Sequence, residues 1–185
     1  MRPQAGKDKI IDSALTLFSD QGFHQTSVDQ IARHAGVSKG LTYNYYDSKE
    51  ALLSAIIERA SERMSGVAGS GNPAGGYQIA LRDFLARLRK MLKAEQPLLR
   101  FQLSLLFDPS LQPVVQDALR ARADDLMDAT IALVASSGVK NPEHHARHLI
   151  AEIDGLSLHY LELFEDYPLD EMLVSLYEKY KGIGK

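Results

Sequence analysis

Apolar residues recur along most of this 185-residue chain at the three- and four-residue spacing of amphipathic helices. The first such series consists of Ile10, Ile11, Ala14, Leu15 and Phe18. Gly22 follows this series as a helix stop. No segment shows the alternation expected of a β-strand, and no internal repeat is visible. The pattern therefore predicts an all-α protein of about nine helices.

Three further helices are predicted before the middle of the chain. Thr26 is expected to start a short helix, with Asp29 three residues later as its capping-box partner. Gly36 suits a tight turn with a positive φ angle, and Ser38 is expected to cap a third short helix. A fourth helix, over residues 48–64, carries its apolar residues on one side.

A glycine-rich segment, SGVAGSGNPAGG at residues 65–76, predicts a flexible loop before a second block of helices. The helices of this block are predicted at 77–95, 98–108, 110–137, 142–166 and 168–180. We therefore expect a three-helix helix-turn-helix head at residues 1–47 and a larger helical domain at residues 48–185.

Composition narrows the classes of function. The chain has no cysteine, which excludes disulfides and thiolate metal sites, and no apolar run of membrane-spanning length. Its N-terminus lacks the apolar region of a signal peptide, so we expect a cytoplasmic protein. The net charge is −3, and six Lys and Arg oppose six Asp and Glu within residues 1–50. Any contact with DNA must therefore depend on the placement of a few cations rather than on bulk attraction.

Two short helices joined by a glycine turn after a longer helix predict a helix-turn-helix unit, whose second short helix enters the major groove of DNA. Lys39 and Lys49, at helix starts, and the tyrosine hydroxyls can reach phosphates. Lys39 is also a candidate for guanine, Leu41 or Thr42 for a thymine methyl, and Asn44 for adenine. Gly40 removes a side chain where the helix would approach DNA. The candidate DNA contacts are Thr26, Ser27, Ser38, Lys39, Gly40, Leu41, Thr42, Tyr43, Asn44, Tyr45 and Lys49.

The stretch LFSDQGFHQTSVDQIARHAGVSKGLTYNYYDSKEALLSA resembles the DNA-binding domain of the TetR family of transcriptional regulators, with a match over about residues 8–57. The resemblance covers the LF and GF pairs, the run from Thr26 to Gly40, Tyr43, and the SKE segment that begins at Ser48. Two positions depart from the family pattern. Thr42 stands where leucine or isoleucine is usual, and Tyr46 stands where phenylalanine is usual and is read as a core residue.

The resemblance implies a homodimer that binds a palindromic operator, with a small-molecule effector in the second domain and a four-helix bundle between the last helices of two subunits. Effector binding would move the fourth helix and change the separation of the two heads, most simply as a repressor released by the effector. The implied effector residues are Phe84, Leu88, Phe101, Leu105, Met127, Ile131, Glu152 and His159. The implied interface residues are Ile153, Gly155, Leu156, Tyr160, Leu173, Leu176 and Tyr177. Glu152 and His159 fit the interface equally well, and the apolar effector residues fit a plain core.

Other classes of function fit the sequence less well. A helical enzyme lacks a nucleophile–base pair, a phosphate loop and a metal set, so we predict no catalytic residue and no cofactor. His144, His145 and His148 are grouped, but without further ligands they suit a polar helix start better than a metal site. A helical interaction module without a DNA role would leave the polar residues at the two short helix starts unexplained.

Overall fold

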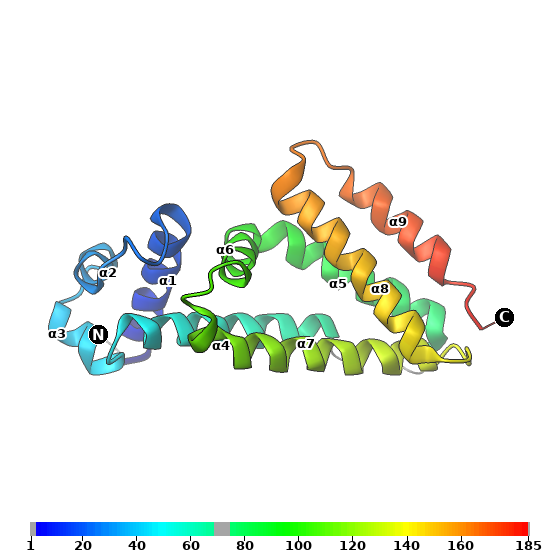
Figure 1. Ribbon diagram of the computed structural model, residues 1–185, viewed down its shortest axis with the longest axis horizontal. Coiled ribbons are helices and arrows are strands. Elements are labelled where there is room, and N and C mark those ends of the chain that lie inside the picture. The colour runs from blue at the N-terminus through cyan, green and yellow to red at the C-terminus, as the bar shows by residue number, and fades with distance from the viewer. Residues whose placement is uncertain (1–2, 69–74, 185) are drawn as a thin grey trace. The chain divides into compact units, whose positions relative to one another are not determined.

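A computed structural model describes residues 3–68 and 75–184, which form nine α-helices, one π-helical turn and no strand within these ranges. The prediction of an all-α chain is confirmed. In chain order the elements are α1 (Pro3–Gln21), α2 (Val28–Ala35), α3 (Lys39–Tyr45), α4 (Lys49–Ala68), α5 (Gly76–Ala94), α6 (Gln96–Leu106), α7 (Gln112–Ala135), α8 (Pro142–Leu158), η2 (His159–Leu163) and α9 (Leu169–Tyr180) (Figure 1). None of the helices in this described part is long and apolar enough to cross a membrane.

Two predicted helix ends are wrong by several residues. Helix α4 continues to Ala68, so the loop expected from residue 65 starts later, and residues 69–74 lie outside the described ranges. Helix α8 ends at Leu158, and η2 takes over with a hydrogen bond from the Phe164 amide to the His159 carbonyl at 3.1 Å. This five-residue spacing is that of a π-helix, which an apolar periodicity of 3.6 residues cannot reveal.

The chain divides into two compact units, one formed by Met1–Ser61 with Pro97–Leu119, and the other by Glu62–Gln96 with Arg120–Lys185. In the first unit α1 contacts α2 and α3. Phe18, which is 1% exposed, lies 5.0 Å from the Phe23 ring and 5.9 Å from the Phe101 ring of α6, centroid to centroid. Tyr46 is also buried, as expected, with the Lys7 ammonium 5.8 Å from its ring centroid. This aromatic core supports the short helices α2 and α3.

In the second unit, α9 packs against both α5 and α8. Its buried stripe consists of Leu169, Leu173, Leu176 and Tyr180. The Tyr77 hydroxyl of α5 donates a hydrogen bond to the Tyr180 carbonyl at 3.0 Å. Helices α8 and α9 run in opposite directions beside each other (Figure 1). The final helix is therefore an integral part of this unit.

Candidate nucleic-acid interface

Helix α2 is started by a capping box one residue later than predicted. The Ser27 hydroxyl accepts a hydrogen bond from the Gln30 amide at 3.2 Å, and the Gln30 side chain accepts one from the Ser27 amide at 2.7 Å. The expected pair of Thr26 and Asp29 is therefore replaced by Ser27 and Gln30, which have the same spacing. At the other end, Gly36 adopts the left-handed conformation with φ 67°, as the turn prediction required.

Thr26 is a structural residue rather than an exposed contact. Its side chain is buried, and its hydroxyl donates a hydrogen bond to the Gly22 carbonyl at 2.8 Å. The Gln21 side-chain amide donates a further hydrogen bond to the same hydroxyl at 3.1 Å. The expectation that Thr26 faces DNA is thus corrected, because these contacts bind its side chain to the end of α1.

Helix α3 begins after Ser38, whose hydroxyl accepts a hydrogen bond from the Leu41 amide at 3.1 Å. Along α3, Lys39, Gly40, Tyr43 and Asn44 are exposed, whereas Leu41 and Tyr45 are half-buried. Thr42 is 0% exposed, and its side chain faces the core of the unit. Its proposed role as a reader of thymine is therefore corrected to a packing role, since a side chain without exposed surface cannot touch a base.

Gly40 lies in α3 at a position where the chain itself leaves space for a side chain. A Cβ atom added there would meet no heavy atom within 4 Å, and its backbone is not left-handed. Glycine in the interior of a helix costs up to about 1 kcal/mol relative to alanine, and Gly40, in the first turn of α3, carries part of this cost. Nothing in the described part of the chain accounts for this cost, so the absence of a side chain at Gly40 fits a requirement imposed by a bound partner.

An ion pair joins the two short helices on this exposed surface. The Lys39 ammonium of α3 lies 3.0 Å from the Asp29 carboxylate of α2, and the side chains are 58% and 52% exposed. The hydrogen bond and the charge of Lys39 lower the pKa of Asp29, and the same contacts with Asp29 raise the pKa of Lys39. Both groups are therefore charged at neutral pH.

Lys49 has a different position from the one expected of a phosphate contact. Its ammonium donates hydrogen bonds to the Phe23 carbonyl at 2.8 Å and the Thr26 carbonyl at 3.0 Å. It also lies 4.3 Å from the centroid of the Phe23 ring. Lys49 thus fastens the segment before α2 to the start of α4, and its assignment to DNA phosphate is corrected because its donors already bind main-chain oxygens.

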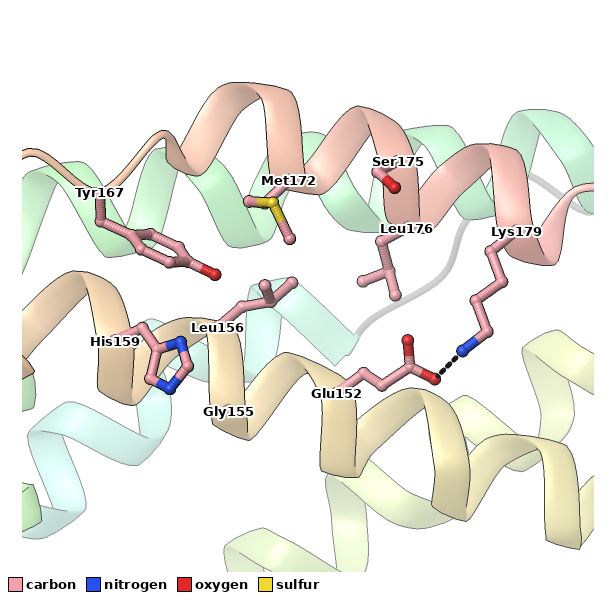
Figure 2. A pocket seen from close by; sticks show the side chains of 9 residues that line it. All are labelled: Glu152, Gly155, Leu156, His159, Tyr167, Met172, Ser175, Leu176 and Lys179. Carbon is pink, nitrogen blue, oxygen red and sulfur yellow. Dashed lines mark hydrogen bonds and ion pairs between the residues drawn. The ribbon is translucent and has the colours of Figure 1, made fainter. Parts of the chain in front are cut away.

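A groove of about 280 Å³ lies between α8 and α9 in the second unit (Figure 2). It is lined by Glu152, Gly155, Leu156, His159, Tyr167, Met172, Ser175, Leu176 and Lys179. At one end the Glu152 carboxylate accepts hydrogen bonds from the Lys179 ammonium at 2.7 Å and the Tyr180 hydroxyl at 2.8 Å. Burial acts to raise the pKa of Glu152, but these two hydrogen bonds outweigh it and hold the pKa below its usual value.

The eight residues assigned to an effector are not brought together in one described cavity. Glu152 and His159 line the α8–α9 groove, whereas Phe101 and Leu105 line a cavity of about 210 Å³ within the first unit. Phe84 and Leu88 are buried on α5, and Met127 and Ile131 are half-buried on α7. Helical spacing groups residues on a face but does not reveal that α6 belongs to the first unit.

The residues assigned to a subunit interface also divide by position. Ile153, Leu173 and Leu176 are buried within the chain itself. Gly155 and Leu156 line the groove. The hydroxyls of Tyr160 and Tyr177 accept hydrogen bonds from Gln96 at 2.6 Å and from Arg82 at 3.3 Å.

The groove also contains residues that the sequence did not single out. Ser175 and Lys179 follow Met172 at helical spacing on α9. The sequence could therefore have predicted that these three residues share one face of that helix. Tyr167 lies outside the regular helices, and its ring is 5.6 Å from that of His159. No periodic signal could have identified it. No group of three or more metal-ligating side chains is found among the residues described by the structure.

Comparisons with known proteins cover both units. The profile for "Bacterial regulatory proteins, tetR family" matches residues 10–56, and that for "Tetracyclin repressor-like, C-terminal domain" matches residues 79–176. An uncharacterized HTH-type transcriptional regulator, YuxN of Bacillus subtilis, is 31% identical over 157 residues, covering 83% of this chain and 53% of YuxN. IcaR of Staphylococcus aureus, a negative regulator of the biofilm operon icaADBC, is 34% identical over 80 residues, 43% of each chain. The chain thus spans about half the length of these curated relatives or less.

Solved structures share the fold over nearly the whole chain. Salmonella enterica GusR matches with a TM-score of 0.75 and 19% identity, covering 99% of this chain and 97% of GusR. SCO4454 of Streptomyces coelicolor matches with a TM-score of 0.80 and 18% identity, covering 98% and 97% of the two chains.

Proposed function

Because this chain belongs to the TetR family of bacterial transcriptional regulators, we propose that it binds an operator in double-stranded DNA through α3. The head, residues 1–47, would bind DNA, and residues 48–185 would form the effector-binding and dimerisation domain. The observation that carries the proposal is the exposed row Lys39, Gly40, Tyr43 and Asn44 on α3, a helix that begins at the Ser38 cap and follows the capped helix α2. The amides and hydroxyls at these starts suit phosphate, and Lys39 and Asn44 suit base edges.

The proposal is tested with DNA recovered by the protein itself. Duplexes selected by the purified protein from a random-sequence pool should contain inverted repeats and bind far more tightly than shuffled duplexes of equal length. Changing Lys39 and Tyr43 together to alanine should weaken binding roughly tenfold or more, because two charged or hydroxyl contacts are lost. Lys90→Ala, at an exposed position on α5, is the control. Recovery of no preferred sequence would contradict the proposal.

A substitution at Gly40 distinguishes an effect on DNA binding from an effect on folding. Gly40→Ala should leave the free energy of unfolding unchanged or raise it, because alanine is the better helix former and its methyl group meets no neighbour. The same change should weaken binding to the selected duplex several-fold, because the methyl group would lie between helix and DNA. Gly182→Ala, where a Cβ atom also meets no neighbour within 4 Å, is the matched control. Unchanged affinity in Gly40→Ala would place DNA elsewhere.

The groove between α8 and α9 is proposed as the contact with a second copy of the chain. Apolar side chains in it or beside it remain exposed. Met172, which lines the groove, is 36% exposed, and Phe164, whose ring lies 5.2 Å from that of His159, is 56% exposed. At Gly155 an added Cβ atom would meet nothing within 4 Å, so the chain itself does not fill this part of the groove. A partner helix can approach closely there, and two heads in one dimer would read the two halves of a palindrome.

Oligomeric state tests this interface. Gly155→Leu should weaken self-association, measured by sedimentation velocity over a range of protein concentrations, while leaving the helical content of the chain unchanged. Ala86→Leu, at an exposed position on α5, adds a side chain of the same size and should have no effect. A Gly155→Leu chain that associates as tightly as the parent would show that the interface lies elsewhere.

We also propose that the regulator is a cytoplasmic repressor released from DNA by a small molecule bound in the second domain. The similarity to IcaR, a negative regulator, supports repression. Phe84 and Leu88 of α5 with Met127 and Ile131 of α7 are the candidate apolar walls, whereas Glu152 and His159 line the groove assigned above to the second copy of the chain. Release of a fluorescent selected duplex by members of a small-molecule panel tests this part, and loss of that response in Leu88→Ala would locate the site.

A further inference from the structure

The cation best placed for DNA contact is bound to a carboxylate of the same chain. Lys39 is the first residue of α3, and its ammonium lies 3.0 Å from the carboxylate of Asp29. Asp29 is the acidic residue in the first turn of α2, and the first turn of α3 contains none. Arg33, one turn further along α2, is the other cation whose charge acts on Asp29.

This pair has two consequences for a binding surface with few cations. The Asp29 carboxylate occupies one of the three N–H donors of Lys39 and draws the ammonium toward α2, so a phosphate or guanine oxygen must either share the ammonium or draw it away from Asp29. The carboxylate also lies close to wherever Lys39 meets DNA, and there it repels phosphates. Both effects oppose binding.

We propose that Asp29 is an internal competitor of DNA that holds Lys39 in the free protein and lowers affinity for the operator. The proposal rests on the DNA-binding function proposed above. In this arrangement DNA displaces the Asp29 carboxylate from Lys39 when it binds, and Asp29 takes Lys39 back when DNA leaves. The protein therefore releases DNA more readily than a protein with the same cations and no Asp29 would. Asp29 would thus tune affinity without touching a base.

The test is the isosteric change Asp29→Asn, which keeps the size of the side chain and removes its charge. Affinity for the selected duplex should rise about threefold at low ionic strength, the scale expected for an exposed ion pair, and this gain should shrink as salt is added. Asp20→Asn, an exposed carboxylate at the end of α1, changes net charge equally and should give a much smaller gain. Equal gains in the two variants would overturn the proposal.

A double-mutant cycle shows whether Asp29 acts through Lys39. In a Lys39→Met background, Asp29→Asn should raise affinity less than it does in the parent, because only the repulsion between the carboxylate and phosphates remains to be removed. If Asp29→Asn gives its full gain without Lys39, general repulsion explains the effect and the proposed competition is wrong. Urea midpoints equal to that of the parent establish that folding is unchanged.

The two proposals can fail separately. If the parent shows no preferred duplex, the proposed function fails together with this inference. If the parent binds its selected duplex and Asp29→Asn does not change the affinity, this inference alone is overturned.

Discussion

The turn around α2 and α3 is held by hydrogen bonds from side chains to main-chain atoms, whereas α9 is held to α5 and α8 largely by contacts between side chains. In the first region Ser27, Ser38 and Lys49 bind amides or carbonyls of the backbone. In the second region Arg89 of α5 forms a two-point ion pair with Asp170 of α9 at 2.6 and 2.8 Å. Lys93 of α5 adds a third contact to the same carboxylate at 3.0 Å.

This difference has a functional meaning. Side-chain bonds to the backbone determine the path of the chain itself, so the short turn presents α3 in one geometry. Contacts between side chains of separate helices set the alignment of those helices and can be exchanged for others when the helices shift. The first arrangement suits the DNA contact proposed for α3, and the second suits the effector response and subunit contact proposed for the second unit.

Among the changes that test this comparison, removal of the Lys49 ammonium should lower the free energy of unfolding most. Lys49→Met keeps the aliphatic stem but leaves the carbonyls of Phe23 and Thr26 without their charged donor, which should lower the free energy of unfolding by about 2 kcal/mol. Urea denaturation followed by circular dichroism measures the change. Lys90→Met is the control at an exposed position. A stable Lys49→Met variant with weakened DNA binding would instead restore the phosphate contact expected from the sequence.

Removing one side chain of the capping box should have a smaller effect. Ser27→Ala deletes the acceptor of the Gln30 amide and should lower the free energy of unfolding by about 1 kcal/mol. Ser19→Ala, at an exposed position on α1, should be close to neutral in the same urea titration. If Ser27→Ala were equally neutral, the start of α2 would not depend on the observed capping box.

The ion pair between α5 and α9 should give a smaller, pH-dependent effect. Hydrogen bonds from Arg89 first and then Lys93 hold the pKa of Asp170 far below 3.8, the value of an ordinary aspartate. The unfolded chain therefore takes up the proton first as pH falls, so the stabilisation is present above pH 3.8 and is lost in stronger acid. Asp170→Asn should lower the melting temperature at pH 7, and the difference from the parent should narrow below pH 3.8.

Asp124→Asn, an exposed carboxylate on α7, is the control for this pH dependence and should show neither effect. A difference between Asp170→Asn and the parent that stayed constant from pH 7 into strong acid would contradict the ion-pair explanation. It would point instead to a role for Asp170 that does not depend on charge.

The same substitution in the two regions should change stability in different directions. The Tyr46 hydroxyl is buried without a hydrogen-bond partner among the described residues, and burial raises its pKa to about 12. Tyr46→Phe should therefore leave stability unchanged or raise it by up to about 1 kcal/mol. Tyr77→Phe removes the hydrogen bond to Tyr180 and should lower stability by about 1 kcal/mol. Urea midpoints that fall equally in both variants would indicate a hidden partner for Tyr46.

Much of the head could be predicted because its signals are local. The Gly36 turn and the Ser38 cap depend on residues within four positions of one another, and the structure contains both. The start of α2 was misplaced by one residue because Thr26 and Ser27 are both good caps, and only the contact of Thr26 with Gly22 decides between them. Lys49 was misassigned because it binds the carbonyls of Phe23 and Thr26, which lie 26 and 23 positions earlier in the chain. Thr42 was misassigned because its burial depends on how α3 packs in the unit.

By itself the sequence determined that this chain is helical, where its short helices turn, and which family its head resembles, because apolar periodicity, caps and glycine turns act over a few residues. Only the tertiary structure decided which polar side chains are used internally. In the folded chain Lys49 binds main-chain carbonyls, Lys39 pairs with Asp29, and Phe101 and Leu105 line a cavity within the first unit. These outcomes depend on which distant segments meet, and the burial and geometry of such contacts arise only when the helices pack together.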